Sequence, residues 1–310
     1  MIYFLTMESR RKKPLLGVIV LLLATVIWGL AYIAQSDAMQ YLGVLTYSGV
    51  RVLVGGIALV PVVCIMHRLS ANRTVPKEQR QRQVHVSFIG GIVCGIFMCA
   101  AMVFQQYGIA YSSVGKSGFL TALYIVLVPV CGILFGRRVT WLSALCVAIA
   151  LVGSYFLCVK EDLVIAFGDW MLIGDAVLFA FQILFIDRFL ARGAEPVLMT
   201  CIEFWTAGLL LLPLMFLVET PTWGGVWAAR VTILYAGLAS GAVGYTMQMI
   251  GQREMEPTAA SLLMSLESVF AALFGWLLLG EQMQLRELFG CALVFLAVIL
   301  SQLPIGRQEA

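Results

Sequence analysis

The chain has 310 residues, of which 61% are hydrophobic and 12% are charged, and its formal net charge is +3. A soluble domain carries roughly 25% charged residues, so this composition excludes a water-soluble globular protein. The apolar residues form runs of membrane-spanning length, and the chain is therefore predicted to be an integral membrane protein.

A helix needs about 20 apolar residues to cross the hydrocarbon core of a bilayer. That rule predicts ten transmembrane helices, with no linker long enough for a soluble domain. The predicted spans are, in chain order, 15–34, 45–66, 86–109, 115–135, 140–159, 170–189, 197–217, 231–251, 258–279 and 286–303. The longest polar stretch, from His67 to His85, is predicted to be a loop.

The Lys and Arg residues predict the orientation, because loops on the cytosolic side carry an excess of both. With the N-terminus inside, the cytosolic segments contain Arg10, Arg11, Lys12, Lys13, Arg68, Arg73, Lys77, Arg80, Arg82, Arg137, Arg138, Arg188, Arg192, Arg253 and Arg307. The outer segments contain only Lys116, Lys160, Arg230 and Arg286. We therefore expect a multi-pass protein of the cytoplasmic (inner) membrane with both termini in the cytosol.

The sequence contains a duplication. Residues 113–136 match residues 257–280 at an offset of about 144, and residues 46–61 match residues 198–213 at an offset of about 152. The matched pairs include Ser117 with Ser261, Thr121 with Ser265, Gly136 with Gly280, Gly56 with Gly208 and Pro61 with Pro213. The match predicts two halves, 1–159 and 160–310, of five helices each. Because five is odd, the halves must cross in opposite directions, so the predicted fold is all-α, with ten transmembrane helices in two inverted five-helix repeats.

Several short motifs carry a family resemblance. Trp28-Gly29 lies in the first span, and the matched segments end in ILFG (133–136) and LLLGE (277–281). Together with FLTALYIVLVP (119–129) and SLLMSLESVFAALFGWLLLGE (261–281), they resemble EamA-type transporters of the drug/metabolite transporter superfamily. The resemblance covers both repeats. It implies the same fold and a transport activity, in a superfamily that moves amino acids, amines, nucleotide derivatives, sugars and drugs.

Two GxxxG motifs occupy equivalent places in the third and eighth spans, Gly91 with Gly95 and Gly237 with Gly241. Small residues at this spacing let helix backbones approach closely. The motif favours packing within the chain over a homodimer face, so we expect a monomer. We also expect the third, fourth, eighth and ninth spans to surround a central cavity.

Glu267 is the strongest functional candidate. An ionisable group at membrane depth costs about 2.5–3.5 kcal/mol on insertion scales, and such groups are usually functional. The helix rise of about 1.5 Å per residue places Glu267 near the middle of the ninth span. Its repeat equivalent is Leu123, so only one half carries the carboxylate. It could cycle a proton or bind a substrate amine. The alternative, a structural acid satisfied by a neighbouring helix, is equally consistent with the sequence.

Other polar and aromatic residues at membrane depth suit a pocket for a small amphiphilic ligand. The expected substrate-binding or coupling residues, besides Glu267, are Trp28, Tyr32, Gln105, Gln106, Thr121, Tyr124, Gln182, Tyr245 and Ser265. Arg51 and Asp175 both fall in the outer half of the membrane, and we expect them to form a structural ion pair. Glu203, the repeat equivalent of Arg51, lies in the inner half, roughly 13 Å away along the membrane normal by helix rise.

These features favour a secondary transporter, exporting small amphiphilic metabolites such as amino acids or amines by alternating access. The lipid bilayer is its other expected partner, and protons are a candidate coupling ion. The chain contains no nucleophile–base pair, no metal-ligand spacing and no nucleic-acid motif. An enzyme, a metal site, a cofactor and a nucleic-acid partner are therefore not expected. The alternatives are a membrane enzyme that acts on lipid, and a structural or sensor protein without transport activity.

Overall fold

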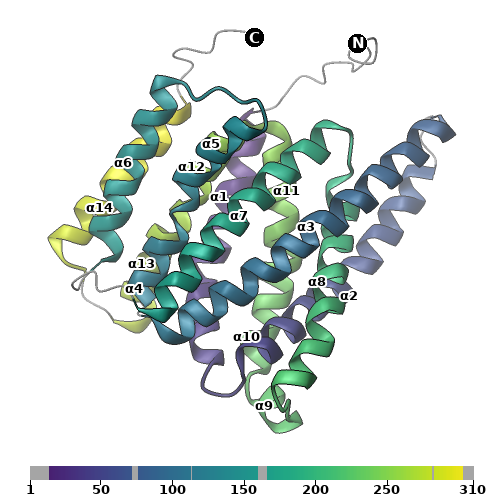
Figure 1. The fold of residues 1–310 in the computed structure, drawn as a ribbon, viewed down its shortest axis with the longest axis horizontal. Helices are drawn as coiled ribbons and strands as arrows, with labels where there is room; N and C mark the ends of the chain where they lie inside the picture. Colours follow the sequence, from purple (N-terminus) through teal and green to yellow (C-terminus); the bar gives the residue numbers. More distant parts are fainter. Residues whose placement is uncertain (1–13, 72–75, 113, 160–165, 281–282, 303–310) are drawn as a thin grey trace.

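The computed structural model of the protein describes residues 14–71, 76–112, 114–159, 166–280 and 283–302. The regular structure of these residues is helical (Figure 1). The reason is physical: in lipid every backbone N–H and C=O needs a partner within the protein, and a helix provides one within its own segment.

The first half contains six helices in the described residues. They are α1 (Pro14–Ala38), α2 (Val44–Ala71), α3 (Lys77–Tyr111), α4 (Val114–Thr121), α5 (Tyr124–Leu134) and α6 (Trp141–Cys158). The second half contains α7 (Phe167–Ala191), α8 (Pro196–Val218), α9 (Trp223–Ala228), α10 (Arg230–Leu234), the π-helix η1 (Tyr235–Tyr245), α11 (Thr246–Glu254), α12 (Pro257–Met264), α13 (Leu266–Leu279) and α14 (Leu285–Gln302).

Nine helical stretches of the described residues are long and apolar enough to span a membrane, and each matches a predicted span. The span predicted at 231–251 is also helical, but it consists of α10, η1 and α11 in direct succession. The total of ten crossings therefore stays a prediction. The protein is a multi-pass membrane protein, as its composition predicts.

The polar stretch from His67 to His85 differs from the predicted loop. The structure continues α2 to Ala71 and begins α3 at Lys77, so most of this stretch is helical. Its Arg, Lys, Gln and Glu side chains have high helix propensity, which allows both helices to continue past the apolar spans.

The two halves share local features at matched positions. Gly136 and Gly280 both adopt a positive φ, +77° and +68°, where α5 and α13 end. Only glycine tolerates this backbone conformation without strain. In addition, Pro61 and Pro213 lie inside α2 and α8. These matched positions therefore have the same local backbone features in both halves.

The packing also repeats. The pair α6 and α14 forms one side of the bundle, while α2, α3 and α8 form the opposite side (Figure 1). Between them, α1 packs against α12 and α13 of the second half, and α7 packs against α4 and α5 of the first half. The matched segments 113–136 and 257–280 are thus central, whereas the matched segments 46–61 and 198–213 lie in α2 and α8 on one side of the bundle.

The glycine motif of α3 is used within the chain. A Cβ atom at Gly91 would lie 2.6 Å from the Cβ of Ile202, and one at Gly95 would lie 2.6 Å from the Cβ of Thr206 and 2.7 Å from the carbonyl oxygen of Glu203. Both glycines therefore face α8, as expected for internal packing rather than a homodimer face.

This contact makes a testable prediction. Gly95→Ala should destabilise the protein by about 1–3 kcal/mol, because the added methyl overlaps α8 and the backbones must separate. Gly118→Ala is the matched control, since a Cβ there would only reach the Sγ of Cys158 at 3.6 Å. Thermal unfolding of the detergent-solubilised protein would measure both. Equal melting temperatures for the two variants would contradict the close α3–α8 contact.

Candidate functional site

A central cavity lies among eight of the predicted spans. It contains about 550 Å³ of space outside protein atoms, counted out to its opening. Its lining residues are Trp28, Ala31, Tyr32, Gln35, Arg51, Val52, Met102, Gln105, Thr121, Phe179, Phe204, Ala236, Ser240, Gly241, Tyr245 and Glu267. The third, fourth, eighth and ninth spans all contribute, as expected, but α1 contributes four residues that this expectation left out.

Two broken helices border the cavity. The fourth span is interrupted at Ala122 and Leu123, and the ninth at Ser265. At both breaks the hydrogen bonds shorten to the i→i−3 pattern: the N–H of Ile125 donates to the carbonyl of Ala122, and the N–H of Ser268 to that of Ser265. Thr121 and Ser265 are repeat equivalents, so the two breaks coincide within about two residues in the sequence match. Such tight turns inside a helix often mark functional hinges.

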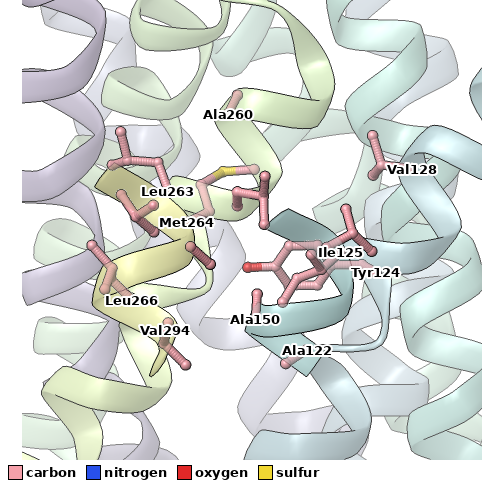
Figure 2. Close-up of a cluster of buried hydrophobic side chains, with 14 of the residues drawn as sticks. Ala122, Tyr124, Ile125, Val128, Ala150, Ala260, Leu263, Met264, Leu266 and Val294 are labelled. Atoms are coloured by element: carbon pink, nitrogen blue, oxygen red, sulfur yellow. The ribbon is translucent and has the colours of Figure 1, made fainter. Parts of the chain in front are cut away.

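The breaks adjoin one hydrophobic cluster. Ala122, Tyr124 and Ile125 follow the first break, while Met264 and Leu266 flank the second, and all five are buried (Figure 2). One side of each broken helix thus packs in the same apolar cluster. The polar residues Thr121 and Glu267 line the cavity.

The second break determines the environment of Glu267. This residue lies in the first turn of α13, where the unpaired backbone N–H groups give the helix a positive end that favours a carboxylate. Its side chain is 9% exposed, and the hydroxyl of Tyr32 donates to its Oε1 at 3.5 Å. The equivalent position in the first half is Leu123, so the carboxylate occupies only one of the two helix breaks.

The expected ion pair between Arg51 and Asp175 is wrong. Nη1 of Arg51 instead donates to Oε1 of Gln35 at 3.0 Å. Asp175 accepts hydrogen bonds at its Oδ2 from Gln105 and Thr121, each at 3.4 Å. The prediction rested on the similar depth of both charged residues. Depth does not determine in which direction a side chain points around its helix axis. The amide and hydroxyl groups of other helices supply the nearer partners.

Aromatic side chains form much of the cavity wall. The indole N–H of Trp28 donates to the carbonyl oxygen of Ser240 at 3.0 Å, which joins α1 to η1. The ring of Tyr245 meets Trp28 edge-on at a centroid distance of 5.3 Å and Phe204 at 5.4 Å. These T-shaped contacts hold the rings in defined positions. The π-helical turns of η1 are also unusual, and such turns are found frequently at functional sites.

Six of the ten predicted substrate or coupling residues line the cavity: Trp28, Tyr32, Gln105, Thr121, Tyr245 and Glu267. The other four lie in neighbouring positions outside its lining. Ser265 donates to the carbonyl of Leu262, and Gln106 donates to that of Gln35. Tyr124 packs edge-on against Phe179, and Gln182 donates to Glu203.

The sequence prediction missed Gln35 and Ser240 as lining residues and assigned Arg51 a structural role. Gln35 fell one residue beyond the predicted first span, whereas α1 continues to Ala38. The available signal for Gln35 was its position, as an uncharged polar residue directly after an apolar run. No such signal marked Ser240, because its carbonyl is brought to Trp28 by the π-helical turns.

Known proteins share this architecture. A family model described as "EamA-like transporter family" matches residues 15–159 and again residues 166–303. An uncharacterized transporter of Archaeoglobus fulgidus is 29% identical over 225 residues, which are 70% of this chain and 70% of that protein. The uncharacterized transporter YoaV of Bacillus subtilis is 21% identical over 303 residues, covering 96% of this chain and 99% of its own length. A solved crystal structure with 15% identity shares the fold, with a TM-score of 0.75 over 95% of this chain and 98% of its own.

A multi-pass helical bundle with a polar cavity between broken helices has the construction of a membrane transporter. The two matches of the family model correspond to the two halves that the internal repeat defines. The chain belongs to the EamA-like transporter family.

Proposed function

We propose that this membrane transporter is a secondary transporter that exports small amphiphilic metabolites such as amino acids or amines by alternating access. The observation that carries the proposal is the cavity between the two helix breaks, with the carboxylate of Glu267 among aromatic walls. A buried carboxylate can bind an amine or a proton, and aromatic rings suit the apolar part of a ligand and can also bind a cation.

The position of the cavity supports alternating access. Its α1 residues, Trp28 to Gln35, lie in the second half of that helix, and Arg51 lies near the beginning of α2. In α3 the lining residues Met102 and Gln105 lie near the end. The cavity is therefore displaced towards the face where α1 ends and α2 begins.

The opposite face is held together by charged residues. Arg137, just after α5, forms ion pairs with Asp187 of α7 and with Glu256, which precedes α12; the contact to Glu256 is 2.8 Å. Both halves of the chain are thus linked on the side away from the cavity. A transporter that is closed on one side in this way must break such contacts to open there.

Transport energy would come from an ion or proton gradient or from substrate exchange, because the sequence contains no ATP-binding domain. We propose that the protein resides in the cytoplasmic membrane with both termini in the cytosol. The Arg137 ion pairs would then close the cytosolic side.

The role of Glu267 is tested by Glu267→Gln, which nearly keeps shape and hydrogen-bonding capacity but removes the charge. If Glu267 carries the coupled proton, proton-driven transport in proteoliposomes should fall while substrate exchange persists. If it binds the substrate amine, binding and both transport modes should weaken. The matched control is Glu203→Gln, because Glu203 is also a buried acid but does not line the cavity. Wild-type transport by a folded Glu267→Gln protein across a pH series would exclude both roles and leave a structural acid.

The proposed orientation is tested by cysteine labelling. In a variant without native cysteines, Gln79→Cys should react with a membrane-impermeant maleimide only after cells are opened, because the start of α3 is proposed to be cytosolic. Gly224→Cys, at the opposite end of the bundle, should react in intact cells. Both positions are exposed in the structure. The reverse pattern would overturn the orientation.

A further inference from the structure

Arg51 is a buried cation in the cavity wall. Arg51 is 4% exposed, and it forms no ion pair with any of the described residues. Nη1 donates to the neutral amide of Gln35, whereas Nε and Nη2 have no hydrogen-bond partner. A buried cation without an ion-pair partner is expensive at membrane depth, which makes Arg51 a candidate for a functional role.

The surroundings of Arg51 hold the guanidinium without neutralising it. Its central carbon lies 5.2 Å from the ring centroid of Tyr47, a cation–π contact from the preceding turn of α2. Gln35 holds one nitrogen from α1. This leaves two donor nitrogens, Nε and Nη2, without a partner on a side chain that lines the cavity. A planar guanidinium with free donors matches a carboxylate or another oxyanion.

A second ionisable residue, Glu267, lines the same cavity. Tyr32 and Gln35 are three residues apart on α1, a rise of about 4.5 Å. Tyr32 donates to Glu267, and Gln35 accepts from Arg51. The two ionisable residues therefore contact successive turns of one helix. Asp175, the other buried acid at this depth, is bonded to Gln105 and Thr121 and does not itself line the cavity.

We propose that Arg51 binds the anionic group of the substrate while Glu267 binds its amine, so that the transported metabolite is a zwitterion such as an amino acid rather than a simple amine. This inference rests on the proposed transport function and narrows its substrate class. The bound carboxylate would supply the counter-ion that Arg51 lacks in the protein, and the aromatic walls would contact the substrate side chain.

The test measures binding to the purified, detergent-solubilised protein. The probes are the L-amino acids with apolar side chains, each paired with its decarboxylated amine and its N-acetylated form. Thermal stabilisation or calorimetric titration gives the affinities. We expect at least one amino acid to bind roughly tenfold more tightly than either of its partners, because each partner leaves one buried charge without its hydrogen bonds.

Substitutions of Arg51 and Glu267 test which charged group of the substrate each residue binds. Arg51→Gln should reduce the affinity for the amino acid to that for the amine, while Arg51→Lys should retain part of the preference. Glu267→Gln should instead remove the advantage of the amino acid over its N-acetylated form. Arg230→Gln, which removes an exposed cation at the same end of the bundle, is the matched control and should bind as the wild type does.

The binding results distinguish a failure of the role proposed for Arg51 from a failure of the proposed transport function. Equal binding of amino acid and amine by the wild type would overturn the role of Arg51 and retain an amine transporter. An amino-acid preference that survives in a folded Arg51→Gln protein would also overturn it. No binding by any probe would overturn both the proposed substrate class and the inference.

Discussion

Backbone hydrogen bonding inside a bilayer is the constraint on which this structure depends. Without water, each N–H and C=O must find a partner in the protein, and uninterrupted helices meet that requirement. Among the described residues, the α-helical pattern is interrupted inside predicted spans at the break before α5, at the break before α13 and in η1. All three contribute to or adjoin the wall of the cavity. The irregular backbone thus lies at or next to the cavity wall.

The two halves are most informative where they differ. Their helix breaks and glycine ends coincide, so each half provides the same hinge and the same helix terminus. The ionisable residues differ between the halves, because Glu267 corresponds to Leu123 and Arg51 corresponds to Glu203. The regular helix α3 likewise corresponds to the span that contains η1. A repeated scaffold combined with unrepeated charges gives one cavity with a defined polarity.

Much of the fold follows from the sequence. Runs of about 20 apolar residues locate the spans, since the thickness of the bilayer fixes their length. The internal match indicates which helices of the two halves correspond, because repeated packing requires repeated residues. The ends of the helices are less predictable: α1, α2 and α3 all continue past their apolar runs, and Gln35 was missed for this reason.

The site is less predictable than the fold. Depth follows from helix rise, and it correctly brought Glu267, Tyr32, Trp28 and Tyr245 to the cavity. Direction around the helix depends on how neighbouring helices rotate against one another, which apolar periodicity cannot determine when most faces are apolar. The wrong pairing of Arg51 with Asp175 arose in this way. The π-helical turns of η1, in which the carbonyl of Ser240 accepts a hydrogen bond from Trp28, had no signal in the sequence pattern.

The central claim is that this cavity is the transport pathway and opens to the two membrane faces in turn. The most direct measurement is the accessibility of Ser240→Cys, a small change in the cavity wall, in a variant without native cysteines. We expect a membrane-impermeant thiol reagent to modify this cysteine from either face, because alternating access requires that the cavity opens to both. The additional change Arg137→Gln should increase modification from the face that carries the Arg137 ion pairs, because it removes those contacts. Modification from one face only, unchanged by Arg137→Gln, would contradict alternating access through this cavity.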